Sequence, residues 1–342
     1  MSNRVMVGLS GGVDSSVAAL LLKEQGFEVT GAYLVTMPGE TCGRQKEEAR
    51  EAAAAIGVGF DAVDVSEAFE REVIDPFVRG YMNGITPNPC AVCNPKLKFG
   101  AILDYALNRG FDCIATGHYA GIEKKGGRWL LKKAESEKDQ SYFLYALSQV
   151  QLSKILFPLG GLSKEAVREK AKNYGLPAAG KPDSQEICFI PDNDYARFVI
   201  ERAGNLPAEG DFLDKQGNVL GRHRGIIHYT IGQRKGLGAF GSRKFVTGIR
   251  PADNAVILGD EEELFSKELT ARDMNWIAIE GLTGAIRAQV KTRSRSAAAP
   301  ATVEPNGCGV RVVFDSPVRS VTPGQAAVLY DGDTVLGGGT IV

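Results

Sequence analysis

The sequence has no apolar run of membrane-spanning length, and its N-terminus lacks the pattern of a secretory signal. Only six of its 342 residues are cysteine, which is too sparse for a disulfide framework and favours reactive thiols. The net charge of −1 points to no class of partner, although a local basic patch would still suit nucleic acid. We therefore expect a cytoplasmic protein of two or three domains with no membrane partner.

Two common phosphate-binding signatures are also missing, yet the chain opens on a glycine-rich turn. Neither GxxxxGK(S/T) nor GxGxxG occurs there. Val5 to Gln25 reads VMVGLSGGVDSSVAALLLKEQ, a short apolar strand, a polar turn and a helix that Gly26 ends. Such a unit directs backbone N–H groups and a helix N-terminus at one spot, which suits an anion. Asp14 would repel a phosphate unless a cation such as Mg²⁺ bridged the two.

Strands alternate with helices over the first 65 residues. After the opening unit we expect a strand from Glu28 to Met37, a helix from Arg44 to Ile56 and a strand from Gly59 to Val65. This order predicts an α/β fold built on a doubly wound parallel sheet. Leu34 lies at the end of the second strand, where such folds hold an adenine, and a core leucine is the alternative interpretation.

A proline-rich stretch carries the most prominent cysteine motif. Thr86 to Phe99 reads TPNPCAVCNPKLKF, and its prolines and asparagines predict a loop rather than a helix. Cys90 and Cys93 form a single CxxC, which fits half of a zinc site, a redox pair or one edge of an iron–sulfur site. No second CxxC occurs in the chain, so a zinc ribbon is excluded.

Two further stretches carry candidate functional residues. Gly117 and His118 follow a strand that begins at Phe111, at the edge where ligands bind in open α/β sheets. A packing or capping role is the alternative for His118. Cys188 is a candidate nucleophile or a buried thiol, and Lys181 is a nearby cation that would lower its pKa.

The composition changes near residue 195. The following segment is rich in glycine and basic residues, and Arg234-Lys235 within TIGQRKGLG suits a phosphate backbone. From about Asn254, short strands at regular spacing predict a small β-barrel. A helix is also expected from Lys138 to Leu147. Basic residues alternate along one expected barrel strand and predict a basic stripe: Lys291, Arg293 and Arg295.

Taken together, eight segments resemble the bacterial tRNA-specific 2-thiouridylases, the MnmA family of the PP-loop ATP pyrophosphatase superfamily. They run in family order over nearly the whole chain: GLSGGVDSS, TPNPCAVCNPKLKF, ATGHY, KDQSYFL, DSQEICFI, IGQRKGLG, VKTRSRS and VTPGQAAVLY. The resemblance implies ATP-dependent replacement of the 2-carbonyl oxygen of the wobble uridine by sulfur, in tRNAs for Lys, Glu and Gln. It also implies three domains that tRNA spans: a PP-loop domain (1–195), a small central domain (196–255) and a C-terminal β-barrel (256–342).

The resemblance assigns roles to the residues at matching positions. Asp14, Cys93 and Cys188 would be catalytic, and no separate metal-ligand set is assigned. The site for ATP and Mg²⁺ would be formed by Gly8, Leu9, Ser10, Gly11, Gly12, Val13, Asp14, Ser15, Leu34 and Gly117. The target base and the rest of the tRNA would contact Asn88, Pro89, Cys90, His118, Lys138, Asp139, Gln140, Ser294, Arg295 and Gln325.

The resemblance implies adenylation of the uridine oxygen, followed by sulfur delivery from a persulfide on Cys188. Cys93 would release that sulfur and form a Cys93–Cys188 disulfide. The sulfur donor would be a cysteine desulfurase or a sulfur-relay protein. Many members carry Asp where this chain has Cys90, so a [4Fe–4S] cluster on the three thiols is the second interpretation. We favour the relay. Leu34 also replaces a Met of other members, and the loop after Met37 is short.

Two other functions fit parts of the sequence. A PP-loop synthetase that activates a small-molecule carbonyl would use the glycine-rich turn, but it would need neither Cys93 nor Cys188. A non-catalytic RNA-binding protein would use the barrel, but it would not need the SGGVDSS turn. Release of AMP and pyrophosphate only in the presence of tRNA separates these alternatives from the thiolase.

Overall fold

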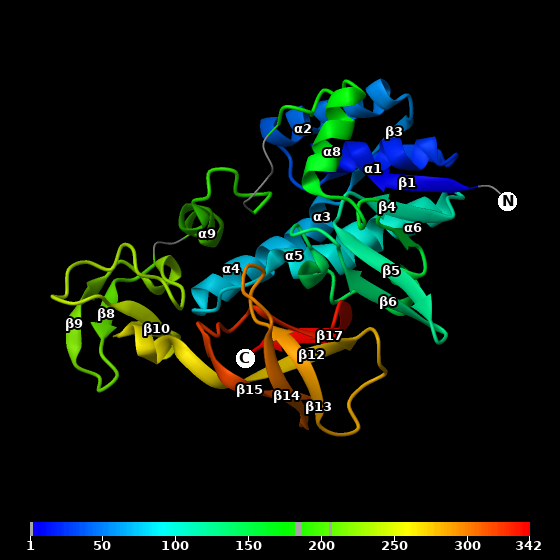
Figure 1. Ribbon diagram of the computed structural model, residues 1–342. Coiled ribbons are helices and arrows are strands. Elements are labelled where there is room, and N and C mark those ends of the chain that lie inside the picture. The colour runs from blue at the N-terminus through cyan, green and yellow to red at the C-terminus, as the bar shows by residue number, and fades with distance from the viewer. Residues whose placement is uncertain (1–2, 182–186, 205–206) are drawn as a thin grey trace.

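The computed structural model describes residues 3–181, 187–204 and 207–342. Its first sheet is wholly parallel, with the strand order β3-β2-β1-β4-β7 (Figure 1). The strands span Arg4–Gly8 (β1), Glu28–Val35 (β2), Gly59–Asp64 (β3), Cys113–Thr116 (β4) and Ile155–Leu156 (β7). The chain order reverses between β1 and β4, so the turn after β1 emerges where open parallel sheets bind ligands. The predicted doubly wound sheet is confirmed.

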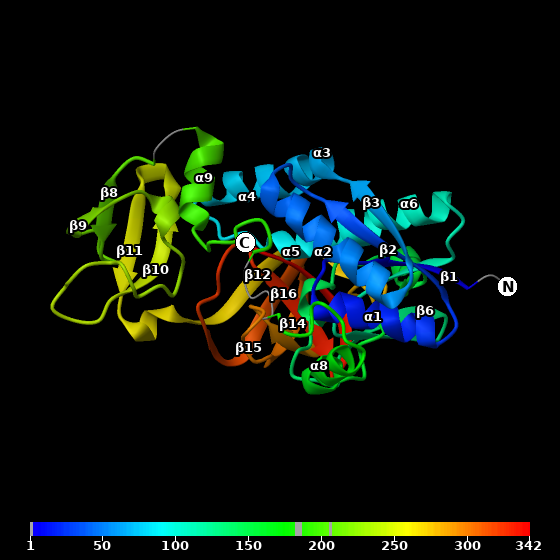
Figure 2. The same cartoon turned by 90° about the horizontal axis from the view of Figure 1, so that it is seen from above.

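Helices cover both faces of this sheet (Figure 2). Val5 and Val7 of β1 face one core, and Met6 faces the other, because successive side chains of a strand alternate. The first core is covered by Val13–Glu24 (α1), Glu40–Ile56 (α2) and Lys164–Asn173 (α8), and the second by Ile102–Asn108 (α6).

The expectation of a loop from Thr86 to Phe99 is wrong. A short helix, Pro89–Cys93 (α5), continues through a π-helical segment, Asn94–Ala101 (η2), into α6. Asn88 caps this helix by accepting a hydrogen bond from the Ala91 N–H at 3.3 Å. Pro89 occupies the first turn, where the missing N–H costs no intrahelical hydrogen bond, so the prolines are compatible with a helix.

A second helical run lies against this one. It comprises Ser66–Phe69 (α3), the π-helical Glu70–Ile74 (η1) and Asp75–Met82 (α4). Together with Tyr195–Ala203 (α9), these helices enclose an apolar cluster that includes Phe77 and Cys93. The CxxC helix is therefore anchored by its buried side rather than suspended in a loop.

The predicted helix from Lys138 to Leu147 is also wrong. Only Ser141–Phe143 forms a single 3₁₀ turn (η3) there. The Asp139 carboxylate accepts hydrogen bonds from the N–H groups of Ala134 and Ser141, each at 3.1 Å. Such local bonds favour a turn over a helix. The capped helix Gln149–Leu152 (α7) follows.

Two β structures follow the parallel sheet. The first is four-stranded, in the order β10-β11-β8-β9, and comprises Gly210–Leu213 (β8), Val219–His223 (β9), Phe245–Arg250 (β10) and Ala255–Gly259 (β11). The expected domain boundary at 255/256 therefore lies at the start of β11, which belongs to this central sheet. Three 3₁₀ turns lie in this region: Ile226–His228 (η4), Pro251–Asp253 (η5) and Glu261–Leu264 (η6).

The second β structure is the expected barrel, which is confirmed. Strand β12 pairs with both β15 and β17, so six strands close on themselves. The strands are Phe265–Trp276 (β12), Ile286–Lys291 (β13), Ala299–Asn306 (β14), Gly309–Arg319 (β15), Ala326–Asp331 (β16) and Thr334–Ile341 (β17). A hairpin from the first domain, Ala120–Lys125 (β5) and Arg128–Lys133 (β6), joins β17 through Thr334 and Lys132. The barrel is thus fastened to the parallel-sheet domain.

The basic stripe is wrong. Strand β13 ends at Lys291, so Arg293 and Arg295 lie in the turn beyond it. Arg293 is half-buried and donates hydrogen bonds to the Ile231 carbonyl at 2.8 Å and to the Thr322 hydroxyl. Arg295 is exposed. Among the described residues, no helix is long and apolar enough to cross a membrane.

Candidate functional site: a glycine-rich turn beside three thiols

The glycine-rich turn links β1 to α1 at the carboxyl edge of the sheet. Gly12 precedes the twelve-residue helix α1 and has no side chain with which to cap it. The Ser15 and Ser16 hydroxyls donate to the Gly12 carbonyl at 3.2 and 2.8 Å, and the Ser10 N–H donates to the Ser15 hydroxyl at 3.2 Å. The first amides of α1 are left without a side-chain acceptor from the cap position, which suits a phosphate.

Two glycines determine how closely this turn packs. Gly11 has a φ of +74°, and a Cβ there would lie 2.9 Å from the Glu48 Cβ of α2. A Cβ on Gly117, just after β4, would lie 2.6 Å from the backbone of Asp14 and Ser15. Because real Cβ atoms do not approach so closely, the start of α1 is locked between α2 and β4 only while both positions are glycine.

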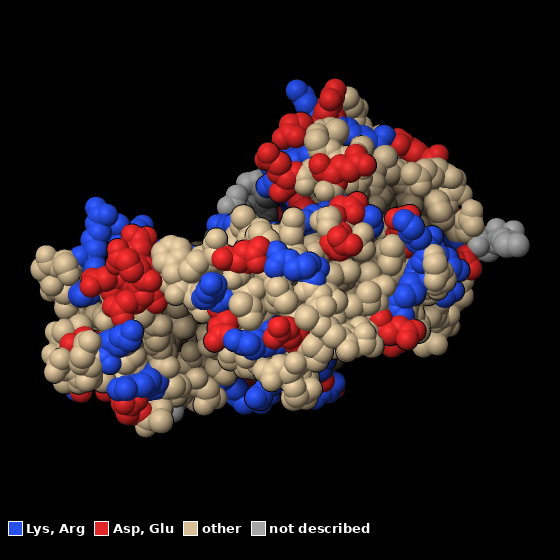
Figure 3. Space-filling model, turned by 60° about the horizontal axis from the view of Figure 1, so that its bottom comes forward, with Lys and Arg blue, Asp and Glu red and all other residues tan. Residues whose placement is uncertain are grey.

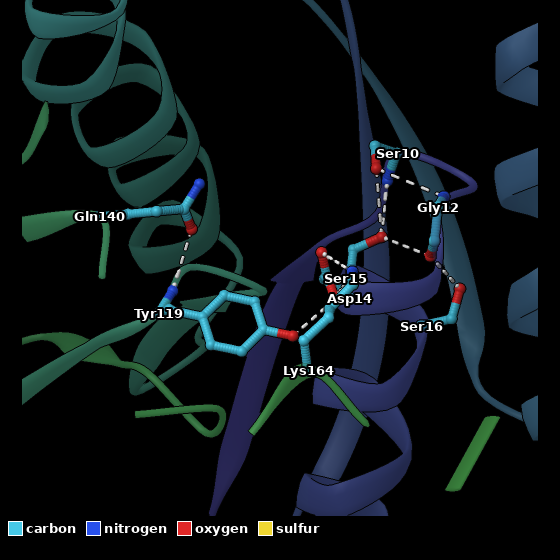
Figure 4. Close-up of polar contacts among 8 residues, drawn as sticks. All are labelled: Ser10, Gly12, Asp14, Ser15, Ser16, Tyr119, Gln140 and Lys164. Carbon is cyan, nitrogen blue, oxygen red and sulfur yellow. Dashed lines mark hydrogen bonds and ion pairs between the residues drawn. The ribbon is translucent and has the colours of Figure 1, made fainter. Parts of the chain in front are cut away.

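Asp14 is held by residues from two distant parts of the chain (Figure 4). The Lys164 ammonium contacts its two carboxylate oxygens at 2.7 and 2.9 Å, and the Tyr119 hydroxyl donates to one of them at 2.9 Å. Lys164 is only 7% exposed, so this pair is shielded from solvent. The protein itself therefore supplies a cation beside Asp14, which the sequence analysis had sought from Mg²⁺ alone.

The three candidate thiols lie near one another without a covalent bond. Cys90 and Cys188 are exposed, whereas Cys93 is buried under the apolar cluster, and all three are free. Burial raises the pKa of Cys93 to about 12, although the Lys98 cation opposes the shift and the other two thiols add to it. Cys93 is therefore a neutral thiol in this state. Of the segment around Cys188, residues 182–186 lie outside the described residues.

Lys98 is the cation that acts on these thiols. It is half-buried on η2. Burial lowers its pKa, and the sulfurs of Cys93, Cys90 and Cys188 raise it by more, so the net shift is upward. Lys181, which we had expected in this role, instead pairs with Glu48 at 2.9 Å and lies 3.4 Å from the Gly11 carbonyl.

His118 connects the thiols with the glycine-rich turn. It directly follows Gly117, its ring lies 5.6 Å from that of Phe99 between centroids, and its Nδ1 lies 2.7 Å from the Thr116 hydroxyl. Burial and, to a lesser extent, the Lys98 charge hold the pKa of His118 well below its usual value. His118 is therefore neutral near pH 7.

The residues expected to contact tRNA are dispersed over the molecule. The Gln325 amide of the barrel donates to the Thr86 carbonyl at 2.9 Å and so links the barrel to the CxxC helix. Gln140 accepts from the Tyr119 N–H at 3.0 Å. Ser294 and Arg295 lie in the turn after β13. Leu34 is half-buried against two apolar clusters, so its adenine and core interpretations both stay open.

A cavity of about 460 Å³ opens between α4, α5 and the barrel. Phe77, Asn88, Tyr145 and Thr340 are among the residues that line it. It brings the predicted base-contacting residue Asn88 next to the barrel. On the face shown in Figure 3, basic and acidic side chains are interspersed over the surface, so that face carries no single basic patch.

Three site residues escaped the sequence analysis. Lys164 appeared as one of several charges on an amphipathic helix, and Tyr119 as the residue after His118. Lys98 was hidden in a segment read as a loop. Lys164 lies 150 residues from Asp14, so its role depends on the folded chain. The position of Lys98, five residues after Cys93, was available but gives no signal without knowledge of the π-helix.

The parallel sheet, the uncapped turn and the closed barrel define a PP-loop nucleotide enzyme with appended β domains. Three family descriptions match in succession: the tRNA methyl transferase HUP domain over residues 3–192, the tRNA methyl transferase PRC-barrel domain over 197–260 and the aminomethyltransferase β-barrel domain over 266–341.

Full-length relatives make the family specific. The chain is 49% identical to a tRNA-specific 2-thiouridylase MnmA of Acetivibrio thermocellus, with 99% of each chain covered. It is 48% identical to that of Clostridioides difficile, with 100% of this chain and 98% of the relative covered. The chain belongs to the tRNA-specific 2-thiouridylase family.

Among solved structures, similarity is confined to part of the fold. The U34-tRNA thiolase NcsA from Methanococcus maripaludis, solved with its [4Fe–4S] cluster, covers 58% of this chain and 66% of its own. The identity is 18% and the TM-score 0.35. So distant a likeness carries no argument about the cysteines of this chain.

Proposed function

We propose that this protein replaces the 2-carbonyl oxygen of the wobble uridine by sulfur in tRNAs for Lys, Glu and Gln, at the expense of ATP. One observation carries the proposal: a phosphate-binding turn and a group of free thiols lie at the same edge of one sheet, joined through Gly117, His118 and Lys98. The full-length similarity to enzymes named tRNA-specific 2-thiouridylase supports it. Its substrates, tRNA and ATP, place the reaction in the cytoplasm.

In the first step the uridine 2-oxygen attacks the α-phosphorus of ATP. A new P–O bond forms, the bond to pyrophosphate breaks, and the carbonyl oxygen becomes part of a good leaving group. The α1 amides and the residues from Gly8 to Ser15 bind the phosphates and stabilise the charge on the departing pyrophosphate. Leu34 and Gly117 border the nucleotide. The Asp14 carboxylate, held by Lys164 and Tyr119, orients this end of the site.

In the second step sulfur replaces AMP. The terminal sulfur of a Cys188 persulfide attacks C2 of the adenylated uridine, and the C2–O bond breaks to release AMP. Cys93 then attacks the Cys188 sulfur. The sulfur–sulfur bond to the base breaks, its electron pair leaves with the 2-thiouridine, and a Cys93–Cys188 disulfide forms. A thiol reductant restores both cysteines, and a cysteine desulfurase or relay protein reloads Cys188.

Two inorganic groups require separate treatment. Mg²⁺ would neutralise phosphate charge, and the uncapped α1 terminus fits a magnesium nucleotide whose phosphates supply most of the ligands. A [4Fe–4S] cluster fits less well. Among the described residues, no three His, Cys, Asp or Glu side chains converge as metal ligands, and Cys93 is a buried neutral thiol. We therefore route no step through a cluster.

The tRNA would extend across all three domains. We propose that Asn88, Pro89 and Cys90 face the target base, near the cavity between α5 and the barrel. Phosphates would contact the exposed Arg234-Lys235 loop and Arg295. The remaining tRNA contacts would be His118, Lys138, Asp139, Gln140, Ser294 and Gln325.

The test is nucleoside mass spectrometry of tRNA after incubation with ATP, Mg²⁺ and a sulfide source. We expect 2-thiouridine at the wobble position, and AMP and pyrophosphate only when tRNA is present. Release of AMP and pyrophosphate with a small molecule and no tRNA would favour the synthetase. Binding of tRNA without release would favour the non-catalytic protein.

A further inference from the structure

The π-helical segment η2 changes which face of its helix Lys98 occupies. In an α-helix each residue turns by about 100°, so Lys98 would lie about 140° away from Cys93, on a different face. In a π-helix the backbone bonds join residues five apart, which brings Lys98 back over Cys93. Single π turns of this kind occur often at functional sites.

Neighbouring residues hold the π conformation. The Gln151 amide donates to the Pro95 carbonyl at 2.7 Å and to the Phe99 carbonyl at 2.9 Å. Gly100 lies five residues after Pro95, and a Cβ on it would come within 2.9 Å of the Pro95 carbonyl oxygen. Only glycine fits that close approach, so this π segment is built into the fold.

The surroundings of Lys98 suit an anion. Cys90 and Cys93 lie on its own helical run, Cys188 comes from the segment before α9, and the neutral His118 follows β4. Among the described residues, no ion pair or hydrogen bond joins Lys98 to a carboxylate, and the charges that act on it are those of the thiols. A half-buried cation without a counter-ion strongly favours any anion that forms beside it.

We propose that Lys98, re-aimed by the π segment, is a catalytic residue of sulfur transfer that stabilises the sulfur anions formed in that step. This inference rests on the proposed function. It assigns Lys98 first to the persulfide anion on Cys188 and then to the Cys93 thiolate that attacks the Cys188 sulfur. Without a nearby cation, a thiol buried like Cys93 would remain protonated and inert.

The test compares Lys98→Met and Lys98→Arg with Lys96→Met. Lys96 lies on the same segment but is exposed and pairs with Glu72, so its loss controls for a general change of charge. The first readout needs neither ATP nor tRNA: the rate of Cys93 alkylation by iodoacetamide at pH 8.5, followed by peptide mass spectrometry. Lys98→Met should slow it at least about tenfold, because the thiolate fraction falls tenfold per pKa unit. Lys98→Arg should recover most of the rate, and Lys96→Met should leave it unchanged.

The second readout separates this inference from the proposed function. With ATP and tRNA, Lys98→Met should release pyrophosphate at close to the unmutated rate but form 2-thiouridine at least about tenfold more slowly. An unchanged Cys93 alkylation rate in Lys98→Met would overturn the role of Lys98, as would loss of pyrophosphate release. Failure of the unmutated protein to thiolate tRNA would overturn the proposed function, while the alkylation rates would still decide whether Lys98 activates Cys93.

Discussion

The glycine-rich turn and the thiol group lie side by side but are built in opposite ways. In the turn, every contact is already made: Gly11 and Gly117 pack against backbone, and Asp14 is held by Lys164 and Tyr119. The thiols are three free groups, one buried and two exposed, with no bond among them. The nucleotide half is thus pre-organised, whereas the sulfur half holds its groups apart until chemistry requires them.

This difference follows from the two reactions. Phosphate binding and transfer need fixed dipoles and no change in the protein, so a rigid site is best. Sulfur transfer needs cysteines that lose protons and exchange bonds within each cycle, so their neighbours must tolerate several charge states. The comparison predicts that changes in the two halves affect different steps.

The largest effects should come from the thiols. We expect Cys93→Ser and Cys188→Ser each to lower thiolation at least about 100-fold, because each removes a nucleophile, while pyrophosphate release continues. Cys90→Ser should retain most activity, and protein purified without oxygen should contain no iron. Stoichiometric iron and sulfide, lost together with activity in all three variants, would replace the relay by a cluster.

Changes in the turn should stop the other step. Gly117→Ala forces a Cβ against the backbone of Asp14 and Ser15, so we expect at least about a 100-fold loss of pyrophosphate release with tRNA binding intact. Asp14→Ala should behave alike. The control is Gly161→Ala, since Gly161 has nothing within 4 Å of an added Cβ. Pyrophosphate release at the unmutated rate in Asp14→Ala would remove that carboxylate from the mechanism.

Basic residues remote from both halves should have smaller effects. If Arg295, Arg234 and Lys235 hold phosphates, replacing each by Ala weakens all tRNAs similarly and flattens the salt dependence by about one slope unit per contact. Arg287→Ala is the control, because Arg287 already pairs with Asp315. An unchanged salt slope in Arg295→Ala would exclude that contact.

The smallest effect concerns protonation. All three histidines have pKa values lowered mainly by burial, so the unfolded chain takes up their protons first as the pH falls below about 6.5. Stability present above that pH should therefore fall on acidification, by up to about 1.4 kcal/mol per pH unit for each histidine. The midpoint of urea unfolding at pH 7.5 and 5.5 measures this loss, and His118→Asn should reduce it.

A spectroscopic version sharpens the comparison between the two halves. The Lys98 charge contributes to the lowered pKa of His118 but not to that of His223. In Lys98→Met we therefore expect the imidazole resonances of His118 to titrate at higher pH and those of His223 to be unchanged. Equal behaviour of the two histidines would mean that Lys98 does not act near His118.

The fold was accessible from the sequence where local patterns decide structure. The apolar strand before Gly11 and the alternation of strands and helices sufficed for the parallel sheet, and regular short strands sufficed for the barrel. The errors lie where local and tertiary effects compete. Prolines in the CxxC segment suggested a loop, although Pro89 fits a helix start. β12 was largely missed because its sequence, FSKELTARDMNW, is polar on its exposed positions.

The site was accessible only in part. The glycine-rich turn and CxxC are contiguous motifs and could be found. Lys164, which meets Asp14 across 150 residues, and Lys98, which depends on a π-helix, could not. Lys181 and Arg293 show the converse error: both were assigned by proximity in sequence, and the fold directs them to Glu48 and to the Ile231 carbonyl.

The central claim is that the uridine oxygen is adenylated before sulfur arrives. The most direct measurement uses tRNA labelled with ¹⁸O at the 2-position of the wobble uridine, incubated with ATP, Mg²⁺ and a sulfur source. Mass spectrometry of the AMP should find one ¹⁸O in its phosphate for each 2-thiouridine formed. AMP that carries no ¹⁸O while 2-thiouridine accumulates would contradict the account.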